Sequence, residues 1–307
     1  MAEGWRNVVS KILHIVPGIN DVANGMVVVA RFLAKEQGDA EVVDLNHEIH
    51  KIHESDVEEV WVHGMWLSKE WLVCLKALRA GKRLVRMTHG SLSPVYLKYQ
   101  SSLKKKLVSP IERYFLRKAD KVIATCQAEG EWIRYYEPCV RKVEVTDLKR
   151  FFDLSRKEHK GRKEGEQLHL LYLGRRHPLK GVEYLESAVS QLNSSNPPLK
   201  TPLLLRIVSN AFGEEKEKIW DWCDVLVFPT LSENFGLVIA EALERGKRVI
   251  TTDGAPAWSP FASATEDKGG SNGYGGRLVY LKGYRDGSPD ERVALLKDAI
   301  GSLNDYL

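Results

Sequence analysis

Two glutamates lie eight positions apart in the stretch LSENFGLVIAEALERG, residues 231–246. Carboxylates so placed can form a catalytic pair, bind two parts of one ligand, or lie on an ordinary helix surface. Apolar residues recur at helical spacing from Leu237 to Leu243, which predicts a helix that includes Glu241 but not Glu233. Eight residues of helix separate the Cα atoms by about 12 Å, whereas carboxyl groups that cleave glycosides with retention lie about 5 Å apart. The spacing therefore favours contacts with two parts of an extended ligand.

Main-chain N–H groups precede this predicted helix. Asn234, Phe235 and Gly236 come at its start, where unpaired donors and the helix dipole attract anions or hydroxyl groups. The same dipole attracts Glu233 without any ligand, an interaction of about 0.3–1 kcal/mol. Glu233 is therefore compatible both with a ligand contact and with a helix-start carboxylate.

A second charged group follows an apolar strand in LHLLYLGRRHPLKG, residues 168–181. Gly174 ends the strand, Arg175 follows it, and Lys180 comes five residues later. Arginine presents a planar fork that suits phosphate, and lysine presents a mobile point charge. These types at this spacing predict an anion site, with Arg176 as the alternative to its neighbour.

Short apolar strands alternate with amphipathic helices in both halves of the chain. This alternation predicts parallel sheets covered by helices on both faces. The charged segment 154–167 lacks apolar periodicity and is interpreted as a linker or exposed loop. The predicted fold class is α/β, with two facing Rossmann-like domains at residues 1–150 and 151–307. For the C-terminal helix, packing against the first domain is an alternative to packing within the second.

Composition limits the classes of protein that this chain can represent. Its 307 residues are 43% hydrophobic and 28% charged, as expected for a folded protein with a substantial core. Its apolar runs are too short to span a bilayer, and its start lacks the pattern of a secretory signal. The four cysteines are scattered without C-x-x-C pairing, which favours free thiols in a reducing cytoplasm.

Positive charge is concentrated in residues 98–121, which contain eight Lys and Arg against two acidic residues. Within this segment, Pro110 is predicted to lie in the first turn of a helix, where its missing N–H costs nothing. The segment is compatible with a solvated amphipathic helix. It also suits an anionic membrane surface, where each cation contributes about 1 kcal/mol, and this second interpretation is preferred.

With these motifs in order, nearly the whole chain resembles the retaining nucleotide-sugar glycosyltransferases of family four, which have the GT-B fold. ENFGLVIAE matches the E-x7-E signature of that family. RMTHGSLSP and the basic helix after it resemble enzymes that build lipopolysaccharide or other cell-surface glycans. Other matching stretches, in the family's order, are NGMVVVARFLA, VHGMW, THGSLSPV, IERYFLRKADKVIATCQAEGEWI and LGRRHPLKGVEYL.

The resemblance implies roles for the charged residues of the second half. Glu241 holds the ribose hydroxyls of the donor, and Glu233 faces the hydroxyls of the donor sugar. Arg175 and Lys180 neutralise the donor diphosphate, so that no metal and no other cofactor is required. The implied catalytic residues are Glu233, Arg175, Lys180 and His89, and the implied donor-binding residues are Glu241, Asn234, Phe235, Gly236 and Gly174.

Roles for the first half also come from the resemblance. His89, in THGS, lies near the donor hexose in such enzymes, although a single histidine at a turn is often structural. Gly18, Asn24 and Gly25 correspond to a loop that approaches the acceptor and phosphate. The family often has two adjacent glycines where this chain has Asn24-Gly25.

The implied function is transfer of a hexose-type sugar from a nucleotide-diphosphate sugar, preferably a UDP-sugar, to a saccharide acceptor. The implied acceptor is lipid-linked, in lipopolysaccharide or other cell-surface polysaccharide synthesis. The first domain binds the acceptor and the second binds the donor. The expected location is the cytoplasm, including the cytoplasmic face of the inner membrane, and no nucleic acid partner is expected.

Two alternatives remain: a non-catalytic paralogue that binds glycans or nucleotide sugars, and a GT-B sugar-nucleotide epimerase. A Rossmann dehydrogenase is disfavoured because no G-x-G-x-x-G opens either half. The chain departs from the family between residues 209 and 224, where a strand and a helix are predicted to be missing. The long glycine-rich segment 251–276 is expected to form a flap.

Overall fold

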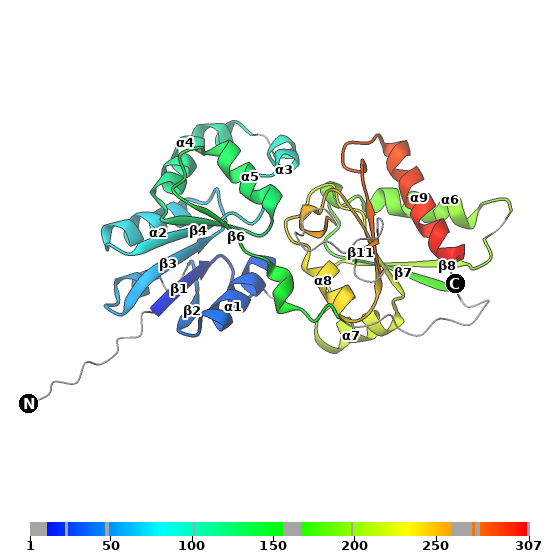
Figure 1. Ribbon diagram of the computed structural model, residues 1–307, viewed down its shortest axis with the longest axis horizontal. Coiled ribbons are helices and arrows are strands. Elements are labelled where there is room, and N and C mark those ends of the chain that lie inside the picture. Colours follow the sequence, from blue (N-terminus) through cyan, green and yellow to red (C-terminus); the bar gives the residue numbers. More distant parts are fainter. Residues whose placement is uncertain are drawn as a thin grey trace, which may run out of the picture. The chain divides into compact units, whose positions relative to one another are not determined.

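A computed structural model describes residues 11–21, 24–46, 49–100, 102–155, 167–197, 199–259, 272–273 and 277–305. The chain forms two compact units, Met1–Leu148 and Lys149–Leu307 (Figure 1). The predicted α/β fold class with two Rossmann-like domains is confirmed. The predicted linker at 154–167 and flap at 251–276 fall largely outside the described residues.

The first unit is built on a six-stranded sheet in the order β2-β1-β3-β4-β5-β6. Each neighbouring pair is parallel, so the carboxyl ends of all six strands meet at one edge of the sheet. The strands are β1 (Lys11–Val16), β2 (Ala40–Asp44), β3 (Val57–His63), β4 (Arg83–Met87), β5 (Lys121–Ala124) and β6 (Val143–Val145).

Helices cover both faces of this sheet (Figure 1). On one face, Val27 and Ala30 of α1 pack with Val16 of β1. The larger core on the other face includes Val73 of α2, Leu116 of α4 and Ile133 of α5. The helices are α1 (Gly25–Gln37), α2 (Ser68–Arg79), α3 (Pro94–Tyr99), α4 (Leu103–Lys118) and α5 (Gln127–Tyr136), with short 3-10 turns η1 (Ile49–His53) and η2 (Leu148–Phe151).

Helix α4 begins earlier than the sequence predicts. Ser102 is its N-cap and accepts a hydrogen bond from the N–H of Lys105. Pro110 therefore lies inside the helix and not in its first turn, so that prediction was wrong. The cap hydroxyl and the buried Phe115 and Leu116 stabilise the long helix despite the hydrogen bond that a proline cannot donate.

The second unit has a six-stranded sheet in the order β11-β12-β10-β9-β7-β8. All pairs are parallel except the antiparallel pair β11 and β12. The strands are β7 (Leu168–Leu173), β8 (Leu203–Val208), β9 (Val225–Phe228), β10 (Arg248–Thr252), β11 (Asn272–Gly273) and β12 (Leu278–Leu281).

The C-terminal helix α9 (Pro289–Asp305) packs against α6 (Val182–Asn193) within the second unit. Between β8 and β9 the chain forms one helix, α7 (Gly213–Trp222), and no strand. The remaining elements are η3 (Pro178–Lys180), α8 (Leu237–Glu244) and η4 (Pro256–Trp258).

Candidate active site

The structure joins two of the predicted site residues directly. The ammonium of Lys180, at the end of η3, lies 2.5 Å from a carboxylate oxygen of Glu233. Glu233 follows β9, and Lys180 follows β7, at the carboxyl edge of the sheet. Both side chains are one-fifth exposed. An ion pair that is accessible at this edge suits the binding of a polar, anionic ligand.

Two glycines hold this ion pair in place. A Cβ on Gly181, at φ +62°, would lie 2.3 Å from the carbonyl oxygen of Pro229. A Cβ on Gly254 would lie 2.1 Å from the carbonyl oxygen of Thr230. The Gly254 carbonyl accepts a hydrogen bond from the N–H of Glu233. The glycine after Lys180 is therefore required by close backbone packing, which explains the Lys-Gly pair in the sequence.

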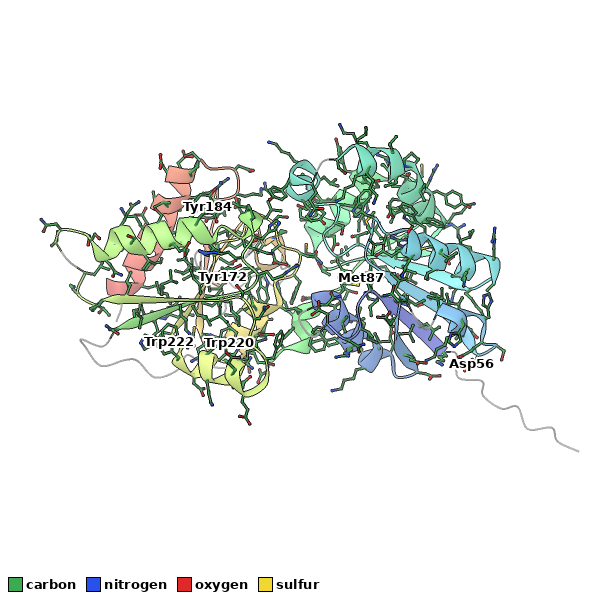
Figure 2. The ribbon with its side chains drawn as sticks, turned by 180° about the vertical axis from the view of Figure 1, so that it is seen from behind. Asp56, Met87, Tyr172, Tyr184, Trp220 and Trp222 are labelled. Carbon is green, nitrogen blue, oxygen red and sulfur yellow. The ribbon has the colours of Figure 1, made fainter. Side chains whose placement is uncertain are left out.

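The structure separates the two candidate arginines. Arg176 pairs with the carboxylate of Glu186, whereas the exposed side chain of Arg175 forms no hydrogen bond or ion pair with any described residue. Tyr172 lies in the second unit (Figure 2), and its buried hydroxyl donates a hydrogen bond to the Arg175 carbonyl at 2.9 Å. Burial and the Glu233 carboxylate raise the pKa of Tyr172. Arg175 is therefore the arginine available to a ligand.

Gly174, the other residue predicted to lie beside Arg175, is half-buried at the end of β7. A Cβ at this position would lie 3.2 Å from the hydroxyl oxygen of Tyr172. The same hydroxyl donates the hydrogen bond to the Arg175 carbonyl. Gly174 thus makes room for the side chain that fixes the Arg175 backbone.

The N-terminus of α8 differs in part from the prediction. The Asn234 N–H donates to the Glu233 side chain at 3.0 Å and is already engaged. The Phe235 ring is buried between Phe152 and Trp258, which gives it a packing role. The N–H groups of Phe235 and Gly236 have no hydrogen-bond acceptor among the described residues. These two donors keep the anion-binding capacity that the sequence predicts.

Glu241 is paired with a residue that the sequence analysis missed. One of its carboxylate oxygens accepts a hydrogen bond from Lys216 of α7 at 2.9 Å. The other oxygen is buried and lies 2.7 Å from the same nitrogen. The charged sequence EEKEKIWDW contains no signal that selects Lys216 among its neighbours.

The predicted loop of the first unit is partly described. Asn24 is the N-cap of α1: its side-chain Oδ1 accepts from the Met26 N–H, and its side-chain Nδ2 donates to the Pro17 carbonyl. Gly18 has a positive φ of 69°, and Gly25 is the first residue of α1. The Asn24 side chain therefore has a structural role here, where the family often has a glycine.

Three histidines form a hydrogen-bonded row across β1, β3 and the turn after β4. The nitrogens of His14 and His63 lie 2.9 Å apart, and those of His63 and His89 lie 2.8 Å apart. The far nitrogen of His14 lies 2.7 Å from the amide oxygen of Gln37. Burial lowers the pKa of His14 to about 4 and that of His89 to about 3. All three rings are therefore neutral near pH 7.

The turn that carries His89 is held by a buried carboxylate on α5. Glu129 accepts hydrogen bonds from the hydroxyl of Thr88 and the N–H of Gly90, both at 2.6 Å. Its other oxygen accepts from the N–H and the hydroxyl of Thr125. His89 itself has a left-handed φ of 49°, so this clamp fixes a backbone conformation that few residue types adopt.

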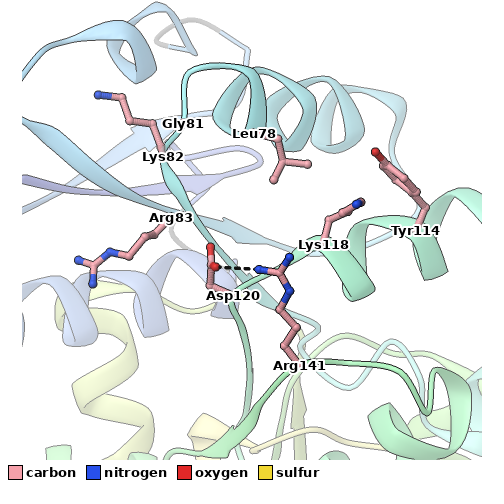
Figure 3. Close-up of a pocket in the computed structure, with 8 residues that line it drawn as sticks. All are labelled: Leu78, Gly81, Lys82, Arg83, Tyr114, Lys118, Asp120 and Arg141. Carbon is pink, nitrogen blue, oxygen red and sulfur yellow. Dashed lines mark hydrogen bonds and ion pairs between the residues drawn. The ribbon is translucent and has the colours of Figure 1, made fainter.

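An open pocket of about 450 Å³ lies at the opposite edge of this sheet (Figure 3). It surrounds residues that precede β4, β5 and β6. Two of its four cations are already engaged: Arg141 pairs with Asp120 at 3.1 Å, and Lys82 donates to main-chain carbonyls. The pocket contains none of the predicted site residues.

The described part of the chain contains neither a candidate metal cluster nor a membrane-spanning helix. No group of three or more His, Cys, Asp or Glu residues there is arranged to hold a metal ion. Within the same residues, no helix has the length and apolar character needed to cross a membrane.

Comparisons with known proteins match both units. Residues 24–146 match the family described as glycosyl transferase 4-like domain, and residues 167–260 match glycosyl transferases group 1. D-inositol 3-phosphate glycosyltransferase of Streptomyces scabiei is 29% identical over 45% of this chain. That match spans 40% of the length of the curated relative.

Solved structures share the fold across almost the whole chain. Anabaena HepE in complex with UDP-glucose has a TM-score of 0.60 at 15% identity, covering 94% of this chain and 89% of that one. Sucrose-phosphate synthase of Thermosynechococcus elongatus has a TM-score of 0.59 at 14% identity, covering 95% and 90%.

The two Rossmann-like units have the GT-B fold of these solved structures. Each unit thus matches a domain model of glycosyltransferases, over residues 24–146 and 167–260.

Proposed function

We propose that this enzyme transfers a hexose-type sugar from a nucleotide-diphosphate sugar to a saccharide acceptor, with retention at the anomeric carbon. The observation that carries the proposal is the contact between Lys180 and Glu233. It joins a cation and a carboxylate from two separate loops of the second unit, and these are the groups that bind phosphate and sugar hydroxyls respectively. A sugar diphosphate presents both kinds of group.

The residues around this contact also suit a sugar diphosphate. Arg175 is exposed, and the N–H groups of Phe235 and Gly236 are available beside Glu233. In the proposed reaction, Arg175 and Lys180 stabilise the charge that develops on the leaving diphosphate, in place of a metal ion. HepE was solved with UDP-glucose and with UDP, which supports a UDP-sugar as the donor.

Glu241 is proposed to bind the donor ribose through the carboxylate oxygen that lies 2.7 Å from the Lys216 ammonium. That oxygen is buried beside Lys216, so the flexible lysine stem must swing aside to admit a ribose hydroxyl. The route that fits these groups is attack on the face from which the diphosphate leaves. The diphosphate then accepts the proton of the acceptor, and no general-base dyad is needed.

Substitution of Glu241 by alanine tests the donor site. Loss of hydrogen bonds from the ribose to a charged group is expected to raise KM for the donor about 10–100-fold. The measurement is steady-state transfer, with the donor first selected by thermal shift across nucleotide-diphosphate sugars.

Glu217→Ala is the matched control, because Glu217 pairs with Arg245 between α7 and α8 but is 59% exposed. It is expected to leave KM within about twofold, as for other exposed pairs. An unchanged KM in Glu241→Ala contradicts the ribose assignment. Purified protein that binds a donor but transfers no sugar would support the non-catalytic paralogue, and conversion of the donor without acceptor would support an epimerase.

We also propose that α4 holds the enzyme against an anionic membrane that presents a lipid-linked acceptor. Leu103 and Leu107 are 74% and 70% exposed, and Ile111 and Tyr114 continue the same stripe. The opposite face of the helix is buried through Glu112, Phe115 and Leu116. The exposed stripe is flanked by basic residues, which is the pattern of an interfacial helix: Lys104, Lys106, Arg113, Arg117 and Lys118.

Vesicle co-sedimentation tests this surface. The unsubstituted protein is expected to bind phosphatidylserine vesicles at low salt and to lose binding as salt rises, because surface charge is screened. Leu103→Ser with Leu107→Ser is expected to weaken binding at least tenfold through lost apolar burial. Leu72→Ser, at an exposed leucine of α2, is the control. Absence of binding even at low ionic strength would exclude the membrane role.

A further inference from the structure

The row of histidines in the first unit has a direction that follows from elementary hydrogen-bond chemistry. A neutral imidazole carries one N–H donor and one lone-pair acceptor. When neutral rings are joined in series, every hydrogen bond must therefore point the same way. The tautomers of His14, His63 and His89 are consequently coupled, and the group at one end of the row sets all three.

Gln37, the last residue of α1, is the group at that end. Its amide oxygen lies 2.7 Å from Nε2 of His14 and can only accept, so Nε2 of His14 carries the proton. Nδ1 of His14 then accepts from Nε2 of His63, and Nδ1 of His63 accepts from Nε2 of His89. Nδ1 of His89 is left with a lone pair.

Several observations favour neutral imidazole rings with these tautomers. His14 and His63 are fully buried, and burial keeps the pKa of both below the usual value. The nearby Arg86 guanidinium also opposes a second positive charge on His63. His89 is half-buried at the carboxyl edge of the sheet, and its Nδ1 has no hydrogen-bond partner among the described residues.

We propose that Gln37, His14 and His63 are positioning residues that fix His89 as the Nε2–H tautomer, so that its Nδ1 accepts a hydrogen bond from a substrate hydroxyl. The inference rests on the proposed function for the identity of that hydroxyl, which belongs to a sugar. The tautomer itself depends only on the row of hydrogen bonds. Gln37 lies three hydrogen bonds away from His89, which makes it a suitable place for a test.

The experiment uses the full chain labelled with 15N in its histidines, because N–H and lone-pair nitrogens of neutral imidazole resonate far apart. Signals are assigned with single His→Gln substitutions. The unsubstituted protein is expected to show a proton on Nε2 of all three rings. Gln37→Glu keeps an acceptor and is expected to preserve this pattern. Gln37→Lys presents only donors and is expected to move the proton to Nδ1 of all three rings.

Kinetics on the same variants test the role of His89. Gln37→Lys is expected to lower kcat/KM about tenfold, the effect of one lost hydrogen bond to substrate. Gln37→Glu should remain within about twofold. If Gln37→Lys fails to fold, Gln37→Met offers neither donor nor acceptor, and a mixture of both His89 tautomers is expected.

The outcomes separate this inference from the proposed function. Two results would contradict the proposed control of the His89 tautomer by Gln37. One is a proton on Nδ1 of His89 in the unsubstituted protein, and the other is an unchanged tautomer in Gln37→Lys. Reversed tautomers with unchanged kcat/KM would overturn the role of Nδ1 as an acceptor. Absence of any sugar transfer by the unsubstituted protein would refute the proposed function, while the spectra would still decide the tautomers.

Discussion

Lys180→Met is expected to lower kcat for sugar transfer about 10²–10³-fold, the usual effect of removing one preorganised donor from a developing negative charge. The ammonium of Lys180 is fixed by Glu233 and by the tight turn at Gly181. It therefore needs no reorganisation when the diphosphate begins to leave. Methionine keeps the length and apolar stem of lysine but removes the charge. The measurement is single-turnover transfer at saturating donor, which isolates the chemical step.

Arg176→Ala is the matched control for this substitution. Arg176 lies four residues before Lys180 but pairs with Glu186 on the surface, so its removal is expected to change kcat by less than about twofold. Arg175→Ala, by contrast, should lower kcat in the direction of Lys180→Met. Retention of more than half of the activity by Lys180→Met would refute the leaving-group role.

Glu129→Ala is expected to lower the free energy of unfolding by about 3–5 kcal/mol, because it removes the acceptor of several buried donors at once. Glu129 accepts four hydrogen bonds from Thr88, Gly90 and Thr125, at distances of 2.6–2.8 Å. Without the carboxylate, the Thr125 N–H and both hydroxyls are buried without this acceptor. The measurement is urea unfolding followed by fluorescence and circular dichroism, with unchanged m-values taken as evidence of two-state behaviour.

Two further variants serve as controls for this loss of unfolding free energy. Glu131→Ala changes an exposed carboxylate on the same helix and is expected to alter stability by less than about 0.5 kcal/mol. Glu129→Gln keeps the size of the side chain but replaces one oxygen by a donor group, so an intermediate loss is expected. A loss below about 1 kcal/mol in Glu129→Ala would contradict the clamp around the His89 turn.

Much of the fold was predictable because it follows from local periodicity. The apolar run at residues 11–16 and the amphipathic stretch after Asn24 correspond to β1 and α1. Regular alternation of such elements leaves parallel sheets as the arrangement that buries them. The start of α4 was predicted wrongly, since Pro110 indicated a first turn. The capping hydroxyl of Ser102 and the burial of Phe115 stabilise a helix that continues through the proline.

The candidate site was predictable only in part. The residue types and spacing around Glu233 and Lys180 indicated a phosphate and hydroxyl site, and the contact between them is present in the structure. No pattern in the sequence predicted that Lys216 pairs with Glu241 or that Arg176 is held by Glu186. Such pairs depend on which helix surfaces face each other, and helix packing is not encoded in the spacing along one helix.

The row of histidines marks the division between sequence and tertiary structure most clearly. The sequence determined that His14 lies within a buried strand and that His89 follows one, because backbone periodicity and exclusion of water act locally. Only strand order and register decided that His63 lies between them, since β3 inserts between β1 and β4. Hydrogen bonds require nitrogens about 3 Å apart. Over gaps of 49 and 26 residues, tertiary packing alone meets that condition.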